Sequence, residues 1–165
     1  MNTQRLLNLN CLLSLLAVVF ALISQHFFDM RPCAWCSFQR FIYLCLAAVC
    51  LVSFFTPIRV IRRFWALLSL GISVAGISAA WFQYSVAQNL FSCDMTFADR
   101  FMHQISGLDT AVPWLFGIYA SCMDAKVSIW GIDYALWSLF LFSLLAFISL
   151  IALFIRDQKK NVQED

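Results

Sequence analysis

The chain has 165 residues, a formal net charge of +2, and a composition that is 62% hydrophobic and only 12% charged. These proportions lie well outside the averages for soluble domains, so the composition excludes an ordinary soluble enzyme and indicates a membrane protein. With so few charges, we expect the lipid bilayer and no nucleic acid among its partners.

Four apolar stretches are long enough to cross the hydrocarbon core of a bilayer, which takes about 20 residues in a helix. They cover about 9–28, 38–55, 64–84 and 132–155. The stretches are continuous rather than alternating, and backbone polar groups in lipid must be satisfied internally, so helices are expected. The sequence predicts an all-α membrane protein with four transmembrane helices in an antiparallel bundle, and a single domain over 1–165.

The first stretch has an alternative interpretation as a cleavable signal peptide, because Arg5 precedes the apolar run from Leu12 to Ile23. The bulky and polar sequence SQHFFDM follows that run, without a small-residue cleavage pattern. We therefore expect a retained helix.

The orientation follows from the basic residues, since short loops rich in lysine and arginine stay in the cytoplasm. One side of the predicted bundle carries seven: Arg5, Arg59, Arg62, Arg63, Arg156, Lys159 and Lys160. The other carries four: Arg31, Arg40, Arg100 and Lys126. We expect both termini and the loop at about 56–63 to be cytoplasmic, and the loops at about 29–37 and 85–131 to face outward.

The seven cysteines divide by predicted depth. Four fall in the outward loops, at Cys33, Cys36, Cys93 and Cys122, whereas Cys11, Cys45 and Cys50 fall inside helices. Disulfides persist in an outward compartment such as a bacterial periplasm, so the loop cysteines are expected to form two pairs. The helix cysteines are interpreted as small apolar residues that fill the core.

The stretch RPCAWCSFQR contains the C-x-x-C motif of Cys33 and Cys36. A disulfide that closes so short a loop adds little stability, so its expected value is chemical. The second cysteine opens a predicted helix, whose N-terminus carries partial positive charge, and Arg40 follows four residues later on the same face. We expect a fixed cation beside a reactive thiolate. The alternative is that the Arg40 side chain simply extends to the polar surface of the membrane.

A zinc site is a second alternative for the motif, with Cys93 and Cys122 as the remaining ligands. These two are 29 residues apart and each stands alone, unlike the paired spacing of structural zinc sites. No metal is therefore expected.

Taken together, these features resemble the disulfide-bond formation protein B (DsbB) family of bacterial inner membranes. The resemblance covers nearly the whole chain and rests on the four helices, on Cys33, Cys36 and Arg40, and on two further cysteines in the second outward loop. Local contexts agree: QHFFDMRPCAWC, FSCDM, ASCMD and a tryptophan early in the last helix.

The resemblance implies a multi-pass inner-membrane oxidoreductase that makes disulfides with quinone, either ubiquinone or menaquinone, and re-oxidises a periplasmic thioredoxin-fold partner of the DsbA type. It implies that Cys93 and Cys122 exchange with the partner, with Cys93 in the mixed disulfide. It also implies that Cys33 and Cys36 face the quinone, with Cys36 at the ring and Arg40 beside it.

Some positions depart from the family pattern. Gln39 stands where a glutamate often precedes the arginine, and the end of the third helix reads WFQYSVAQN, so Gln83 or Gln88 is expected near the quinone in place of a basic residue. The histidines His26 and His103 are interpreted as structural. The helical spacing of Phe97, Phe101 and Ile105 favours a segment of the second loop that lies on the bilayer.

Two other functions remain open. One is a quinone or quinone-epoxide reductase of the vitamin K type, against which the position of the C-x-x-C early in the chain argues. The other is a non-catalytic four-span scaffold with inert disulfides. The sequence leaves open which quinone and partner are used, and whether the resting disulfides are Cys33–Cys36 with Cys93–Cys122 or include a Cys36–Cys93 bond.

Overall fold

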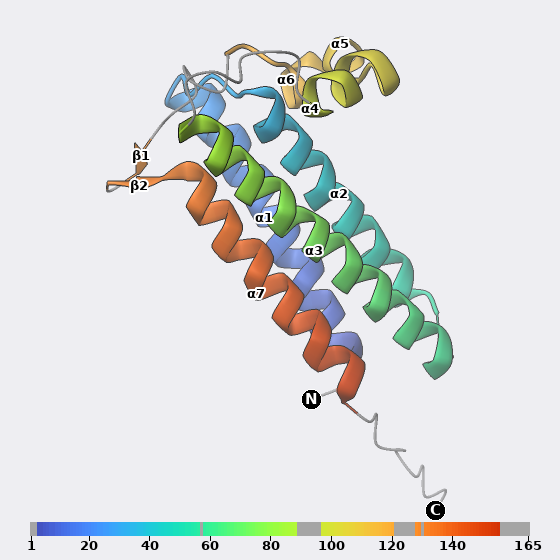
Figure 1. Cartoon of the computed structure of the whole chain (residues 1–165). Helices are drawn as coiled ribbons and strands as arrows, with labels where there is room; N and C mark the ends of the chain where they lie inside the picture. Colours follow the sequence, from blue (N-terminus) through green and yellow to red (C-terminus); the bar gives the residue numbers. More distant parts are fainter. Residues whose placement is uncertain (1–2, 57, 89–96, 121–127, 130, 156–165) are drawn as a thin grey trace, which may run out of the picture.

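The computed structural model describes residues 3–56, 58–88, 97–120, 128–129 and 131–155. Four long helices lie side by side as an antiparallel bundle: α1 (Thr3–Phe27), α2 (Ala34–Phe54), α3 (Arg59–Gln88) and α7 (Tyr134–Phe154) (Figure 1). Helix α3 packs against α7 and α2, and α1 packs against α2 and α7. The predicted all-α, four-helix architecture is confirmed.

The remaining described elements gather at one end of the bundle, around the start of α2 (Figure 1). They are α4 (Phe97–Asp99), the π-helical turn η1 (Arg100–Ile105), α5 (Leu108–Ala111) and α6 (Pro113–Phe116). Two short antiparallel strands, β1 (Ser128–Ile129) and β2 (Ile132–Asp133), precede α7. We call this the loop end; the chain starts at the opposite end (Figure 1).

The helices do not coincide with the apolar stretches from which they were predicted. Helix α2 begins at Ala34, before the expected 38–55, and α3 extends beyond 64–84 in both directions. Conversely, 132–133 belong to β2 rather than to the last helix. A helix can continue past the hydrocarbon core because polar side chains at its ends remain hydrated, so hydropathy marks the span and not the helix ends.

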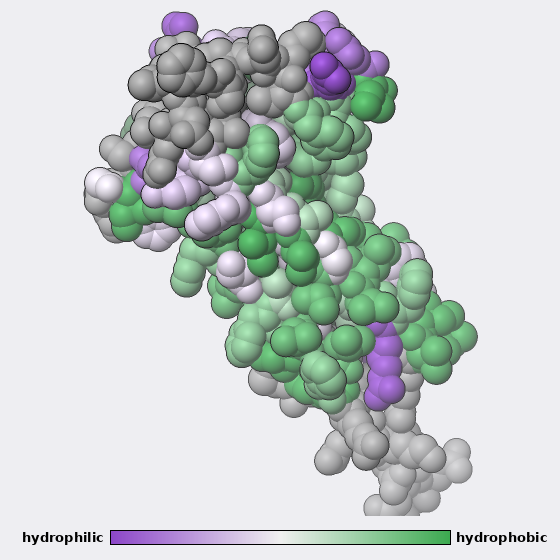
Figure 2. All heavy atoms as spheres, viewed as in Figure 1, coloured by the Kyte–Doolittle hydropathy of each residue, from purple (hydrophilic) through white to green (hydrophobic). Residues whose placement is uncertain are grey.

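All four long helices are long and apolar enough to cross a membrane. Large apolar side chains such as those of Leu12, Phe20, Phe140 and Phe147 are exposed on the outer surface of the bundle. Apolar residues cover most of the visible face of the helices, whereas hydrophilic ones are more frequent toward the loop end (Figure 2). This is the surface expected of a bundle whose solvent is lipid.

A buried polar cluster joins three helices away from the loop end. The Asn10 Nδ2 atom of α1 donates to Ser149 Oγ at 2.7 Å, to the Leu145 carbonyl at 3.3 Å and to Ser69 Oγ at 3.4 Å. Ser69 of α3 and Ser149 of α7 are themselves 2.8 Å apart through their hydroxyls. Such contacts hold transmembrane helices together because no water competes for the donors and acceptors.

A close approach between α3 and α7 depends on Gly76. A Cβ atom at this position would overlap the ring of Phe142, which is fully buried. The Phe142 ring in turn stacks on Tyr43 of α2, with ring centroids 4.1 Å apart and planes 5° apart. The missing side chain at residue 76 therefore positions an aromatic pair that reaches the middle of the bundle.

Gly76→Ala is expected to lower the free energy of unfolding by about 1–3 kcal/mol, because the added methyl group displaces the Phe142 ring. The measurement is unfolding of the detergent-solubilised protein by increasing sodium dodecyl sulfate, followed by circular dichroism. Gly71→Ala is the matched control on the same helix, where a Cβ atom meets nothing within 4 Å. A loss of stability as large for Gly71→Ala as for Gly76→Ala would contradict this account.

Candidate functional site

The start of α2 brings two thiols together at the loop end. Cys33 is the N-cap residue, with φ −86° and ψ 172°, and α2 begins at the next residue. The extended residue and the first helical turn place Cys33 Sγ 3.2 Å from Cys36 Sγ, a distance that fits a thiol–thiol hydrogen bond. Cys33 is buried and Cys36 is partly exposed. The site is thus a dithiol at the end of a membrane-length helix.

A chain of hydrogen bonds leads from Cys36 into the bundle. Gln83 of α3 donates from Nε2 to Cys36 Sγ at 3.4 Å, and its Oε1 accepts from Gln39 Nε2 at 2.7 Å. Gln39 Oε1 accepts from the Ser138 hydroxyl of α7 at 2.6 Å, and the Tyr43 hydroxyl lies 3.1 Å from Ser138 Oγ. The four polar side chains are buried, so the chain is shielded from water.

The guanidinium group of Arg40 is also buried, one helical turn beyond Cys36. Its Nη1 atom donates to Gln25 Oε1 at 2.5 Å and to the Leu115 carbonyl at 2.9 Å, and Nη2 donates to the Ala21 carbonyl at 3.2 Å. These contacts tie α2 to α1 and to α6. All three acceptors are neutral, so these bonds hold the cation in place without neutralising its charge.

A cavity of about 120 Å³ opens beside Cys36 and Arg40, between α1, α2 and α7. Its wall is mostly apolar and includes Phe20, Tyr134 and Trp137. The residues that line it further include Ala17, Ala21, Ser24, Gln25, Met30, Arg31, Pro32, Gln39, Tyr43, Ser138 and Leu141. A sulfur, a cation and aromatic side chains therefore face one space that can hold a flat organic ring.

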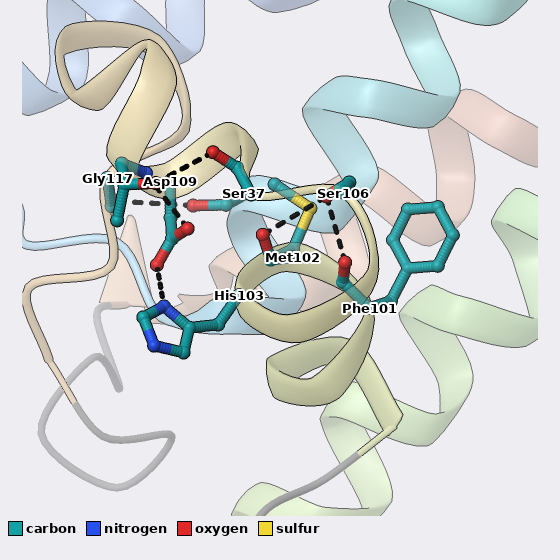
Figure 3. Close-up of polar contacts among 9 residues, drawn as sticks. Ser37, Phe101, Met102, His103, Ser106, Asp109 and Gly117 are labelled. Carbon is teal, nitrogen blue, oxygen red and sulfur yellow. Dashed lines mark hydrogen bonds and ion pairs between the residues drawn. The ribbon is translucent and has the colours of Figure 1, made fainter.

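The segment that contains α6, called the cover below, is bonded to the start of α2, which carries the dithiol. The Tyr119 backbone N–H donates to the Pro32 carbonyl at 3.0 Å, next to Cys33. One turn further along α2, the Ser37 hydroxyl donates to the Gly117 carbonyl at 3.3 Å (Figure 3). With the Arg40 bond to Leu115, these contacts fix the segment at three points.

The helical turns α4, η1 and α5 pack beside this cover. Phe101 contacts the rings of Phe38 and Phe41 on α2, with centroids 5.2 Å and 5.5 Å away. His103 Nδ1 lies 2.7 Å from Asp109 Oδ2, and the imidazole ring faces the carboxylate in Figure 3. This contact links η1 to α5 and agrees with the structural role expected of His103.

The structure brings three predicted site residues together, namely Cys33, Cys36 and Arg40. Cys93 and Cys122 lie outside the described residues. Gln83 touches Cys36 and Gln39 from α3, but it is not among the residues that line the cavity. Gln83 bonds to Cys36, and Cys36 does line the cavity, so the expected place of Gln83 near a quinone stays a prediction.

Sequence reasoning did not single out Gln25, Tyr43 and Ser138, and it treated Gln39 only as a missing carboxylate. All four take part in the hydrogen bonds around Cys36 and Arg40. The signal that could have found them is the presence of a polar side chain within or at the end of an apolar stretch, which needs a partner in a membrane. Tyr43 and Ser138 are such residues.

This fold and site define a class, that of multi-pass membrane proteins whose reactive groups are thiols. Comparison with known proteins agrees: the family profile described as "Disulfide bond formation protein DsbB" matches residues 3–152. The protein named Disulfide bond formation protein B from Herminiimonas arsenicoxydans is 31% identical over 148 residues, which cover 88% of this chain and 91% of that relative. Its namesake from Dechloromonas aromatica (strain RCB) is 29% identical over 140 residues, covering 83% and 82%.

The chain belongs to the DsbB family. The match spans all four long helices and the dithiol, so it confirms the resemblance inferred from the sequence. The protein is accordingly a multi-pass bacterial membrane protein of disulfide-bond formation, and an oxidoreductase.

Arg40→Lys is expected to lower the free energy of unfolding by about 1–3 kcal/mol, since an ammonium group cannot reach all three acceptors that the planar guanidinium group holds. Unfolding by sodium dodecyl sulfate measures this change. Arg63→Lys serves as the matched control, because Arg63 is exposed on α3. Equal stability of Arg40→Lys and the unmodified protein would show that the three bonds do not hold the bundle to its cover.

Proposed function

We propose that this protein is a quinone-dependent thiol oxidase of the bacterial inner membrane, which re-oxidises a periplasmic thioredoxin-fold partner of the DsbA type. The observation that carries the proposal is the Cys33–Cys36 dithiol, one sulfur of which faces a cavity between membrane-length helices. A lipid-soluble acceptor can reach such a cavity from the bilayer, whereas a soluble cofactor cannot reach it easily.

The lining of the cavity supports a quinone head group, either of ubiquinone or of menaquinone, as the proposed ligand. Both have a flat ring with two carbonyl oxygens, and the walls offer aromatic faces at Tyr134 and Trp137 together with the N–H groups of Arg40. Offset aromatic stacking and charge-assisted hydrogen bonds suit such a ring. When bound, a quinone accepts two electrons and two protons and becomes a quinol.

The residues of the chain supply those electrons and protons and stabilise the charge that appears on the way. Oxidation of the Cys33 and Cys36 thiols to a disulfide releases two electrons and two protons, which balances quinone reduction. The thiolate is the reactive form of cysteine, and the positive charge of Arg40 lies one turn from Cys36. Arg40 also faces the cavity, so the same cation can stabilise negative charge on an oxygen there.

The partner's two electrons are proposed to enter through Cys93 and Cys122, with Cys93 forming the mixed disulfide. Reduction of a Cys93–Cys122 disulfide by the partner's dithiol oxidises the partner, and the resulting thiols then reduce a Cys33–Cys36 disulfide by exchange. The bond between Tyr119 and Pro32 supports this route, because it joins the segment that leads to Cys122 with the residue before Cys33.

The proposed orientation has both termini in the cytoplasm and the loop end in the periplasm. Arg5 and Arg63 lie near the starts of α1 and α3, at the end of the bundle opposite the dithiol (Figure 1). Basic residues near helix ends favour the cytoplasmic side. The dithiol would then face the compartment in which protein disulfides form.

Replacement of Cys33, Cys36, Cys93 or Cys122 by serine is expected to abolish quinone reduction by the purified protein supplied with reduced DsbA-type protein, since each sulfur takes part in one exchange. The absorbance of the quinone measures turnover. Cys45→Ser, in α2 away from the dithiol, is the matched control and should keep turnover. No turnover with either quinone, together with loop cysteines that resist mild reductant, would favour an inert scaffold.

Ala17→Phe is expected to raise the KM for quinone by about tenfold, which corresponds to about 1.4 kcal/mol, because the larger side chain fills part of the cavity. Exchange between the reduced partner and the protein in a single turnover should not change. The matched control is Val19→Phe, at an exposed position on the same helix. An unchanged KM in Ala17→Phe would place the quinone elsewhere.

A further inference from the structure

The hydrogen-bond chain that ends on Cys36 has a direction. A serine hydroxyl carries one hydrogen, and Ser138 donates it to Gln39 Oε1. Tyr43 is therefore the donor toward Ser138, and its one hydrogen is shared between Ser138 Oγ at 3.1 Å and the Ser138 carbonyl at 3.4 Å. Gln39 donates to Gln83, and Gln83 donates to the sulfur. All four donors point the same way, toward Cys36.

We propose that Tyr43, Ser138, Gln39 and Gln83 form a donor relay that keeps the Gln83 amide N–H directed at Cys36 Sγ and so stabilises the thiolate of this cysteine. All four are positioning residues: Gln83 touches the sulfur, and the other three act through it. The relay itself does not depend on the proposed function. The inference rests on that function only where it says that the thiolate reacts with a quinone.

The amide of Gln83 would have no preferred orientation if Gln39 were absent. An amide can present either its oxygen or its nitrogen to a neighbour, and only the network around it decides. Gln39 is held by Ser138 at its oxygen, so its nitrogen faces Gln83 Oε1, and the Gln83 nitrogen is left for the sulfur. A fixed donor of this kind favours the charged form of the group it faces.

Two physical effects strengthen the relay. The four side chains are nearly inaccessible to solvent, with exposed fractions of 3% for Gln39, 6% for Tyr43, 7% for Gln83 and 8% for Ser138. Hydrogen bonds in such surroundings are stronger than in water, and aligned donors polarise one another. The Tyr43 ring stacks on Phe142, whose position depends on the absence of a side chain at Gly76. This stacking fixes the far end of the relay.

The test is the rate at which iodoacetamide modifies Cys36 in the reduced, quinone-free, full-length protein in detergent, with the modified residue located by mass spectrometry. Only the thiolate reacts, so the rate at a fixed pH follows its population. Gln83→Leu should slow modification about tenfold, as expected for loss of a hydrogen bond to a charged group. Ser138→Ala and Tyr43→Phe should slow it less, about threefold or below, in order of distance from the sulfur.

Gln39→Glu is the sharpest variant, because it keeps the shape of the side chain and reverses the relay. A carboxylate only accepts, so Gln83 would turn its N–H toward residue 39 and its oxygen toward the sulfur. We expect modification to slow at least as much as in Gln83→Leu, and the pH of half-maximal rate to move upward. The carboxylate also repels the thiolate through space, so Gln39→Met, which removes the amide without adding charge, must slow modification as well. If Gln39 had only a packing role, the rate in Gln39→Met would equal that of the wild-type protein.

Gln4→Leu and Ser143→Ala are the matched controls, at the far end of α1 and on the outer face of α7. If Cys36 is modified at the wild-type rate in both Gln39→Glu and Ser138→Ala, the relay is overturned. These two variants provide the test if Gln83→Leu does not fold. If modification of Cys36 slows in the expected order across the variants but the wild-type protein turns over no quinone, the relay stands and the proposed function is overturned. Turnover with ungraded modification rates would overturn the relay alone.

Discussion

A buried cation in a lipid-facing bundle imposes the main constraint on this structure. Transfer of a guanidinium group out of water is costly unless acceptors surround it, and the acceptors must come from the protein. Arg40 finds them on α1, at Ala21 and Gln25, and on α6, at Leu115. One side chain therefore joins α1, α2 and the cover beside the cavity next to Cys36.

Two of the polar clusters in the described part of the bundle differ in organisation. The cluster of Asn10, Ser69 and Ser149 joins three helices and also contacts the Cys50 thiol, at 3.8 Å from Ser69 Oγ, away from the cavity. The chain from Tyr43 to Gln83 ends on the sulfur of Cys36, which lines the cavity. In a medium without water both stabilise helix contacts, but only the second leads to a sulfur beside that cavity.

The sequence was sufficient to predict the four helices and the dithiol with its arginine, because hydropathy and local spacing determine both. It placed Cys36 near a helix start, and the structure has Cys33 as the N-cap of α2. It could not predict the acceptors of Arg40. Nor could it predict the contact between Gln83 and Cys36, which are 47 positions apart. Such pairs depend on how α3 rotates against α2, and hydropathy carries little information about rotation in a helix that is apolar on most sides.

The two sulfurs of the motif differ in their surroundings although they nearly touch. Cys33 is 1% exposed and follows Pro32, whose carbonyl accepts from the Tyr119 N–H, whereas Cys36 lines the cavity and receives the Gln83 donor. This division arises because Cys33 precedes the helix and Cys36 lies within its first turn, so their side chains leave the backbone in different directions. In the proposed function, Cys33 would exchange with a thiol on one side and Cys36 would deliver electrons on the other. The three-residue spacing would then separate two reactions that compete if both sulfurs face the same space.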